Sequence, residues 1–143
     1  MPLQPSADHI YDPVNKVWQH SPAAPTQEDV RVERDRRLAL GFDYDFADAR
    51  GTHTFAMTES DMIGWDEVTK GAQVAINLGR HGDPFNIVTE TGAATVTANE
   101  WQQILVAMTT LRQVIWQASF ALQAMDAIPS DYADDSHWQT RTI

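Results

Sequence analysis

The sequence predicts an α+β fold: two short β-hairpins packed with a short helix, a middle helix and one long C-terminal helix, preceded by an extended Pro-rich arm. Two stretches of alternating or strand-like residues around turn formers indicate the hairpins. Segments with apolar residues at three- and four-residue spacing, each opened by a capping residue, indicate the helices. The 143 residues, 43% of them hydrophobic, are enough for one domain with a real core.

The N-terminal arm, residues 1–26, holds five of the seven prolines. Proline fixes φ and lacks a backbone donor, so this stretch resists both helix and central strand. Within it, residues 10–18 favour a short hairpin around the turn formers at 12, 13 and 15. Large apolar groups are rarely left in water. We therefore expect the arm to be a docking segment that covers a surface of this chain or of a partner, through Ile10, Tyr11, Val14, Val17 and Trp18.

Residues 27–40 are predicted to form the first helix. Thr26 is a suitable N-cap, acidic residues follow in the first turn, and Gly41 provides a C-terminal stop. Four acids and four bases lie between positions 28 and 37, and Glu33 and Arg37 form an i,i+4 pair in the favourable order. This composition is typical of a solvated, salt-bridged surface helix.

Two hairpins flank the predicted middle helix. Aromatic and acidic residues alternate from 42 to 46, and the chain can return over 52–55 after a turn at 49–51. A second hairpin is expected over 85–97, with its turn at Thr91-Gly92. Between them, Thr58 and Asp61 resemble a capping box that opens a helix to about residue 77. Gly64 and Gly71 weaken the helical pattern and suggest a break in this helix.

The long final helix gives the strongest signal. Thr97 and Glu100 form a capping-box pattern, and the helix is predicted to run to about Ala127 before Pro129. Its apolar residues repeat at three and four residues over nearly four heptads. We call this set the seam: Trp101, Ile104, Met108, Leu111, Ile115, Ala118, Leu122 and Met125.

Two interpretations of the seam are open. It is either the core face of a monomer or a surface that meets copies of itself or another chain. Between Trp101 and Met125 the only charged residue is Arg112, and further apolar groups lie off the seam. Because a helix apolar on most sides is buried on most sides, and a small domain has little material to wrap it, we expect the seam to be an interface.

Composition and motifs disfavour several function classes. A net charge of −10 argues against a nucleic-acid binder or a basic membrane-surface peptide, and no apolar run is long enough to span a membrane. With no cysteine and no His pair at i,i+4, thiolate and histidine metal sites are not expected. Asp43, Asp45 and Asp48 lack the glycine and glutamate of a calcium loop. We predict no catalytic residue, no metal and no cofactor.

The chain divides into the arm, a small α+β domain over 27–128 and an acidic tail over 129–143. The tail is expected to lie on the surface, tethered by Tyr132 and Trp138.

One family resemblance covers residues 30–127. It rests on the runs ERDRRLALGFDYDFADARGTHTFAMTESDMIGW and FNIVTETGAATVTANEWQQILVAMTTLRQVIWQASFALQAM. These resemble an uncharacterised domain family of tailed bacteriophages and phage-like gene transfer agents, found in tail-fibre and tail-associated proteins. The family has no established active site, so the resemblance carries over no catalytic residue.

The resemblance implies a virion or assembly role. We expect a non-enzymatic structural component of a phage tail, a tail-fibre or baseplate-associated connector that docks through its arm and its long helix. A fibre assembly chaperone is the first alternative and a glycan-active enzyme the second. The expected partners are other tail or tail-fibre proteins, in a homo-oligomer or hetero-complex, without nucleic acid or membrane. The expected location is the virion tail, after synthesis in the host cytoplasm.

Overall fold

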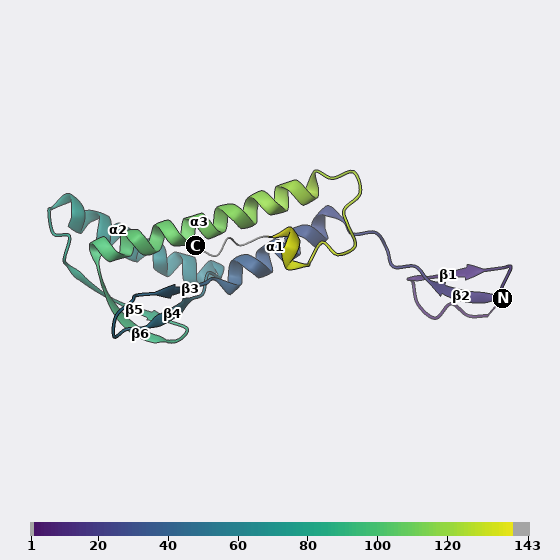
Figure 1. Ribbon diagram of the computed structural model, residues 1–143, viewed down its shortest axis with the longest axis horizontal. Helices are drawn as coiled ribbons and strands as arrows, with labels where there is room; N and C mark the ends of the chain where they lie inside the picture. The colour runs from purple at the N-terminus through teal and green to yellow at the C-terminus, as the bar shows by residue number, and fades with distance from the viewer. Residues whose placement is uncertain (1, 139–143) are drawn as a thin grey trace.

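The computed structural model describes residues 2–138. Within this range the chain forms three α-helices and three two-stranded antiparallel sheets, which confirms the predicted α+β class (Figure 1). The elements are β1 (His9–Asp12), β2 (Val17–His20), α1 (Gln27–Leu40), β3 (Phe42–Asp45), β4 (Thr52–Phe55), α2 (Glu59–Asn77), β5 (Pro84–Thr89), β6 (Gly92–Thr97), α3 (Ala98–Gln123) and the 3₁₀ turn η1 (Asp135–His137).

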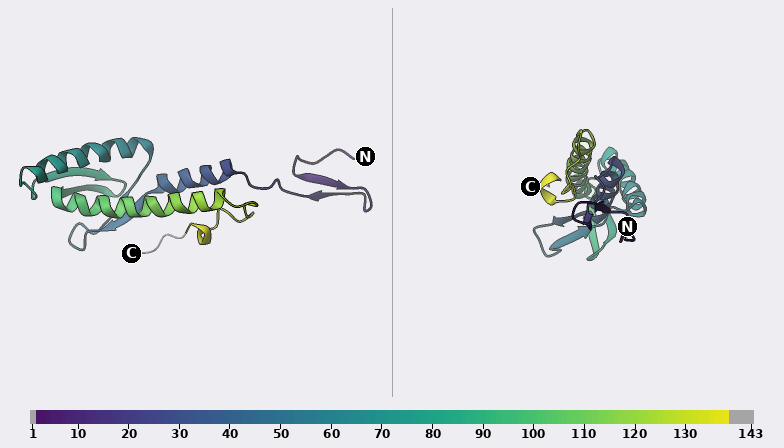
Figure 2. Two further views of the ribbon diagram at one scale, coloured as in Figure 1. Left: turned by 90° about the horizontal axis from the view of Figure 1, so that it is seen from above. Right: turned by 90° about the vertical axis from the view of Figure 1, so that its right-hand side faces the viewer.

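The arm is not extended throughout. β1 and β2 pair as a hairpin within it, with His9 opposite His20 and Asp12 opposite Val17. Residues 21–26 then connect this hairpin to α1 without regular secondary structure. The hairpin stands clear of the helices, beyond the N-terminal end of α1 (Figures 1 and 2).

All three helices begin at a threonine that forms a complete capping box. Thr26, Thr58 and Thr97 each accept a hydrogen bond from the backbone N–H three residues on, and the acidic side chain there accepts one from the threonine's own N–H. The predicted starts of all three helices are confirmed. The predicted break in α2 is wrong, since the helix runs unbroken through Gly64 and Gly71.

Gly71 has a packing reason to be in this helix. A Cβ at this position would lie 2.9 Å from a ring carbon of Phe85 on β5, so the missing side chain lets the hairpin approach α2 closely. Gly41 is required even more strictly at the end of α1. Its φ is +73°, and a Cβ there would overlap the carbonyl oxygen of Phe55 on β4.

We call residues 27–138, which follow the arm, the body. Its two hairpins, β3–β4 and β5–β6, meet at the end of β4. In the first hairpin, Phe42 pairs with Phe55. In the second, a turn at Glu90-Thr91 joins β5 to β6, one residue before the predicted turn at Thr91-Gly92. The backbone N–H of Glu90 donates to the carbonyl of Thr54 at 3.0 Å. The buried ring of His53 lies 2.8 Å from the hydroxyl of Thr89. These contacts fix one hairpin against the other.

Two hydrophobic cores lie along α3. The first brings the two body hairpins and α2 against the N-terminal part of α3, and the second brings α1 and the tail against its C-terminal part. Leu111 packs against both clusters. α3 is therefore the element that joins the two halves of the body.

The tail belongs to the second core. Trp138 is fully buried and donates from its indole N–H to the carbonyl of Tyr132 at 2.7 Å, as expected for a tether. Arg37 of α1 lies over the Trp138 ring and donates to the carbonyl of Ala133 at 2.8 Å. Residues 139–143 of the predicted tail lie outside the described residues.

Candidate docking surfaces

The seam of α3 faces its own chain. Trp101, Ile104 and Met108 are buried in the first core, and Ile115 and Leu122 are buried in the second. The expectation that these side chains meet another chain is wrong. α1, α2 and the two body hairpins supply enough material to cover one face of α3.

The other three seam residues are less deeply buried. Leu111 and Ala118 are partly buried against the same cores. Met125 lies beyond the end of α3 and is 46% exposed, because the helix ends at Gln123 and not near Ala127. The carbonyl of Gln123 accepts a hydrogen bond from the Gln27 side chain of α1, a tertiary contact at the point where α3 stops.

The arm hairpin has two chemically different faces. Residues directly opposite each other in an antiparallel pair share a face. One face carries four rings, with Tyr11 and Trp18 5.3 Å apart between ring centres and His9 and His20 5.1 Å apart. The other face carries Ile10, Asp12, Val17 and Gln19.

A local hydrogen-bond network shapes the tip of this hairpin. The Asp12 carboxylate accepts hydrogen bonds from the backbone N–H groups of Val14 and Asn15 and from the side chains of Asn15 and Gln19. The Asn15 side chain, then its N–H, lowers the pKa of Asp12 below its ordinary value. Lys16 closes the turn at a φ of +56°. The tip is therefore formed by the arm's own polar groups, as an Asx turn.

The predicted docking residues of the arm divide between exposed and half-buried. Ile10 is 62% exposed, Val14 84% and Val17 48%, whereas Tyr11 and Trp18 are half-buried against each other. Neither hydrophobic core includes a residue of the arm. The hairpin thus exposes apolar side chains without contributing to the cores of the body.

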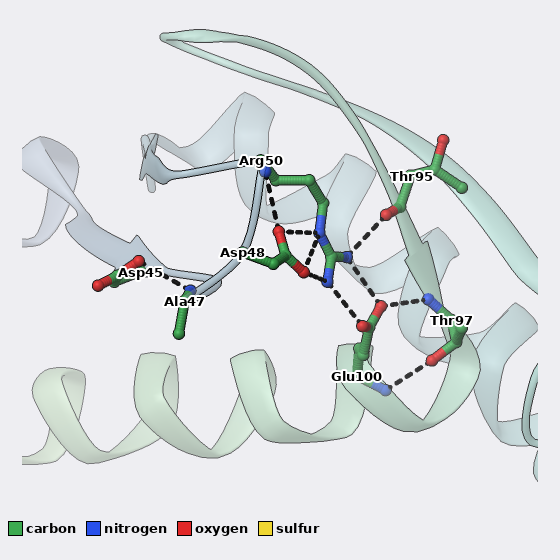
Figure 3. Close-up of polar contacts among 7 residues, drawn as sticks. All are labelled: Asp45, Ala47, Asp48, Arg50, Thr95, Thr97 and Glu100. Atoms are coloured by element: carbon green, nitrogen blue, oxygen red, sulfur yellow. Dashed lines mark hydrogen bonds and ion pairs between the residues drawn. The ribbon is translucent and has the colours of Figure 1, made fainter.

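An ion-pair network joins the β3–β4 turn to the start of α3 (Figure 3). Arg50 donates to both carboxylate oxygens of Glu100, at 3.0 and 2.8 Å, and to the carbonyl of Thr95 at 2.9 Å. It also pairs with Asp48 at 2.6 Å, and its guanidinium lies 4.2 Å from the centre of the Phe46 ring. Sequence reasoning did not find this cluster, because Arg50 and Glu100 are separated by 50 residues.

The charges in this network stabilise one another. Hydrogen bonds from Arg50 lower the pKa of Glu100 below its ordinary value and hold that of Asp48 at about 2. The two carboxylates in turn raise the pKa of Arg50, Glu100 contributing most. Each charged group of the cluster has an oppositely charged partner within the chain. The cluster therefore holds the β3–β4 turn against the start of α3.

Among residues 2–138, no three His, Asp or Glu side chains are grouped closely enough to hold a metal ion. No helix within this range combines the length and apolarity that a bilayer crossing requires. Comparisons with protein-family models, curated proteins and solved structures found no match to the chain.

Proposed function

We propose that this protein is a non-enzymatic structural component of a bacteriophage tail, a connector that docks on a neighbouring tail or tail-fibre protein through its arm. The tail setting rests on the resemblance of residues 30–127 to tail-associated domains. The docking role rests on one observation: a separate hairpin presents Ile10, Val14 and Val17 to solvent and adds nothing to either core.

The energetics of a small hairpin support docking. An isolated two-stranded hairpin is marginally stable in water. A partner that covers Ile10 and Val17 would remove apolar surface from water and hold both strands in place. The opposite face offers Tyr11 and Trp18, residue types that often dominate binding energy at interfaces.

The backbone of the arm offers a second mode of contact. Among residues 2–138 this sheet consists of β1 and β2, so within that range each strand has one edge without a partner strand. Such edges readily accept a strand from another protein, with main-chain hydrogen bonds giving affinity and side-chain pockets giving specificity. A tail protein with a free strand edge is the partner this geometry fits.

The test is incorporation into purified phage particles. The full chain should be found in particles at a fixed copy number, and a variant without residues 1–24 should be lost from them while keeping its fold. This deletion retains Thr26, the N-cap of α1. Unchanged incorporation of the deletion variant would overturn the arm as the docking element.

A matched pair of substitutions separates docking from general surface effects. Ile10→Asp removes an apolar side chain from the arm, and Val32→Asp does the same on α1; both residues are 62% exposed. Only the arm variant should lose incorporation. A chain that binds the fibre during assembly but is absent from finished particles would instead identify an assembly chaperone.

A further inference from the structure

A second stripe of α3 faces away from the cores. Its members repeat at three and four residues, on the side of the helix opposite the seam, and each is exposed: Gln103, Val106, Thr110, Gln113, Gln117 and Phe120. We call this set the outer stripe. Figure 2 shows α3 along one side of the body, with α2 and the hairpins beside its N-terminal part and α1 beside its C-terminal part. The outer stripe is separate from the arm.

The outer stripe carries no charge, in a chain whose net charge is −10. α1 has eight charged residues among its 14, and the solvent-facing side of α2 includes Asp66, Glu67 and Lys70. α3 has only Glu100 and Arg112 among its 26 residues. Neither of these belongs to the stripe. A solvated helix face normally carries charges, so this face has the composition of a covered one.

The order of residues in the outer stripe fits a second copy of the same chain. Val106 lies seven positions before Gln113 and Phe120 lies seven positions after it. If two copies of α3 pack antiparallel about a two-fold axis at Gln113, each Val106 meets a Phe120 of the other copy. Thr110 then lies near Gln117, and Gln113 meets its own copy. Apolar residues face apolar ones and amides face polar ones, as an isologous interface requires.

Charge favours the same arrangement. Two copies that each carry −10 repel each other, and the repulsion is smallest where the facing surfaces are neutral. The antiparallel order also separates the acidic segments that follow α3, which include Asp126, Asp131 and Asp134. Parallel packing would bring these segments together. Antiparallel helix dipoles add a further small attraction.

We propose that the outer stripe binds a second copy of this chain, forming a dimer in which the two α3 helices cross antiparallel at Gln113. The inference does not depend on the arm or on the tail setting. Its tests use the isolated full-length protein with the arm intact. Failure here would therefore leave the proposed function standing, and failure of particle incorporation would leave the dimer standing.

The first test measures mass by light scattering at increasing protein concentration. The wild-type chain should reach twice its single-chain mass of 16.0 kDa. Val106→Asp should reduce the mass to that of one chain, and Val32→Asp should leave the dimer intact, although both valines are 62% exposed. A monomeric wild type, or a Val106→Asp variant that stays dimeric, would overturn the proposal. Circular dichroism confirms that both variants fold.

The second test uses the absence of cysteine from the chain. A disulfide requires Cα atoms within about 7 Å of each other. Gln113→Cys should form a covalent dimer on oxidation, because the axis brings the two copies of this position together. Gln103→Cys should not, because 20 residues of helix, about 30 Å, separate the two copies. Efficient coupling at position 103, or none at 113, would refute the antiparallel arrangement.

Discussion

Arg50 and Glu100 form a two-pronged ion pair, with nitrogen–oxygen distances of 3.0 and 2.8 Å, that joins the β3–β4 turn to the first turn of α3. Glu100 is also the acidic member of the capping box of α3, where it accepts a hydrogen bond from the backbone N–H of the N-cap residue Thr97. One carboxylate therefore serves both the start of α3 and its attachment to a hairpin.

Replacing Arg50 by lysine should lower the free energy of unfolding by about 1–2 kcal/mol, because an ammonium group cannot bind both oxygens of Glu100 while reaching Asp48 and Thr95. Urea denaturation measures the effect. Arg80→Lys is the control, since Arg80 pairs with Asp83 through a side chain that is 64% exposed. This substitution should lower the free energy of unfolding by less than about 0.5 kcal/mol. Equal costs would show that the Arg50 network adds little stability.

The same network predicts a dependence of stability on pH. Asp48 and Glu100 have lower pKa values in the folded protein than their ordinary values of 3.8 and 4.5, so the unfolded chain binds protons first on acidification. The stabilisation is complete at neutral pH and is lost as the pH falls below about 5 toward the Asp48 pKa of about 2. Thermal melts across this range measure it.

Glu100→Gln provides the control for this pH effect. The variant should be less stable than the wild type at neutral pH and should lose less stability on acidification, because one of the two carboxylates is gone. An acid-induced loss equal to that of the wild type would assign the pH dependence to other groups.

Gly41→Ala should destabilise the protein by more than about 2 kcal/mol, since the new methyl group would overlap the Phe55 carbonyl and the positive φ is itself unfavourable. Gly79→Ala is the matched control, with a φ of +74° and open space around the added atom. Its cost should be about 1 kcal/mol. Similar values for the two variants would exclude steric overlap as the main cause.

Ile104→Ala should cost about 2–5 kcal/mol, because it leaves a cavity in the first core. Ile63→Ala makes the same change on α2 at a side chain that is 64% exposed, compared with 0% for Ile104. Its effect should remain within about 0.5 kcal/mol. Equilibrium unfolding of both variants tests the inward orientation of the seam, and equal stabilities would contradict it.

Local signals in the sequence predicted most of the fold. Thr58 with Asp61 and Thr97 with Glu100 placed two helix starts correctly, because a capping box is formed by residues within one turn. The alternation around Tyr44 likewise predicted the β3–β4 hairpin. These features depend on neighbours in the chain and not on tertiary packing.

The orientation of α3 could not be predicted from periodicity. Its seam and its outer stripe both repeat at three and four residues, so spacing alone cannot distinguish the face covered by the chain's own elements from the face left outside. The end of α3 at Gln123 was missed for a related reason, since Gln27 and Arg31 of α1 meet that residue. Good helix formers continue past it in the sequence.

The attachment of the arm has a mechanical consequence. The arm leads directly into α1 along the long axis of the molecule (Figure 1), and Gln27 and Arg31 in the first turns of α1 bond to the last residue of α3. Tension applied through the hairpin would therefore load α1 and α3 lengthwise, sliding one along the other. Such shear strains many contacts at once, so the body should resist pulling in this direction better than forces that peel its strands apart.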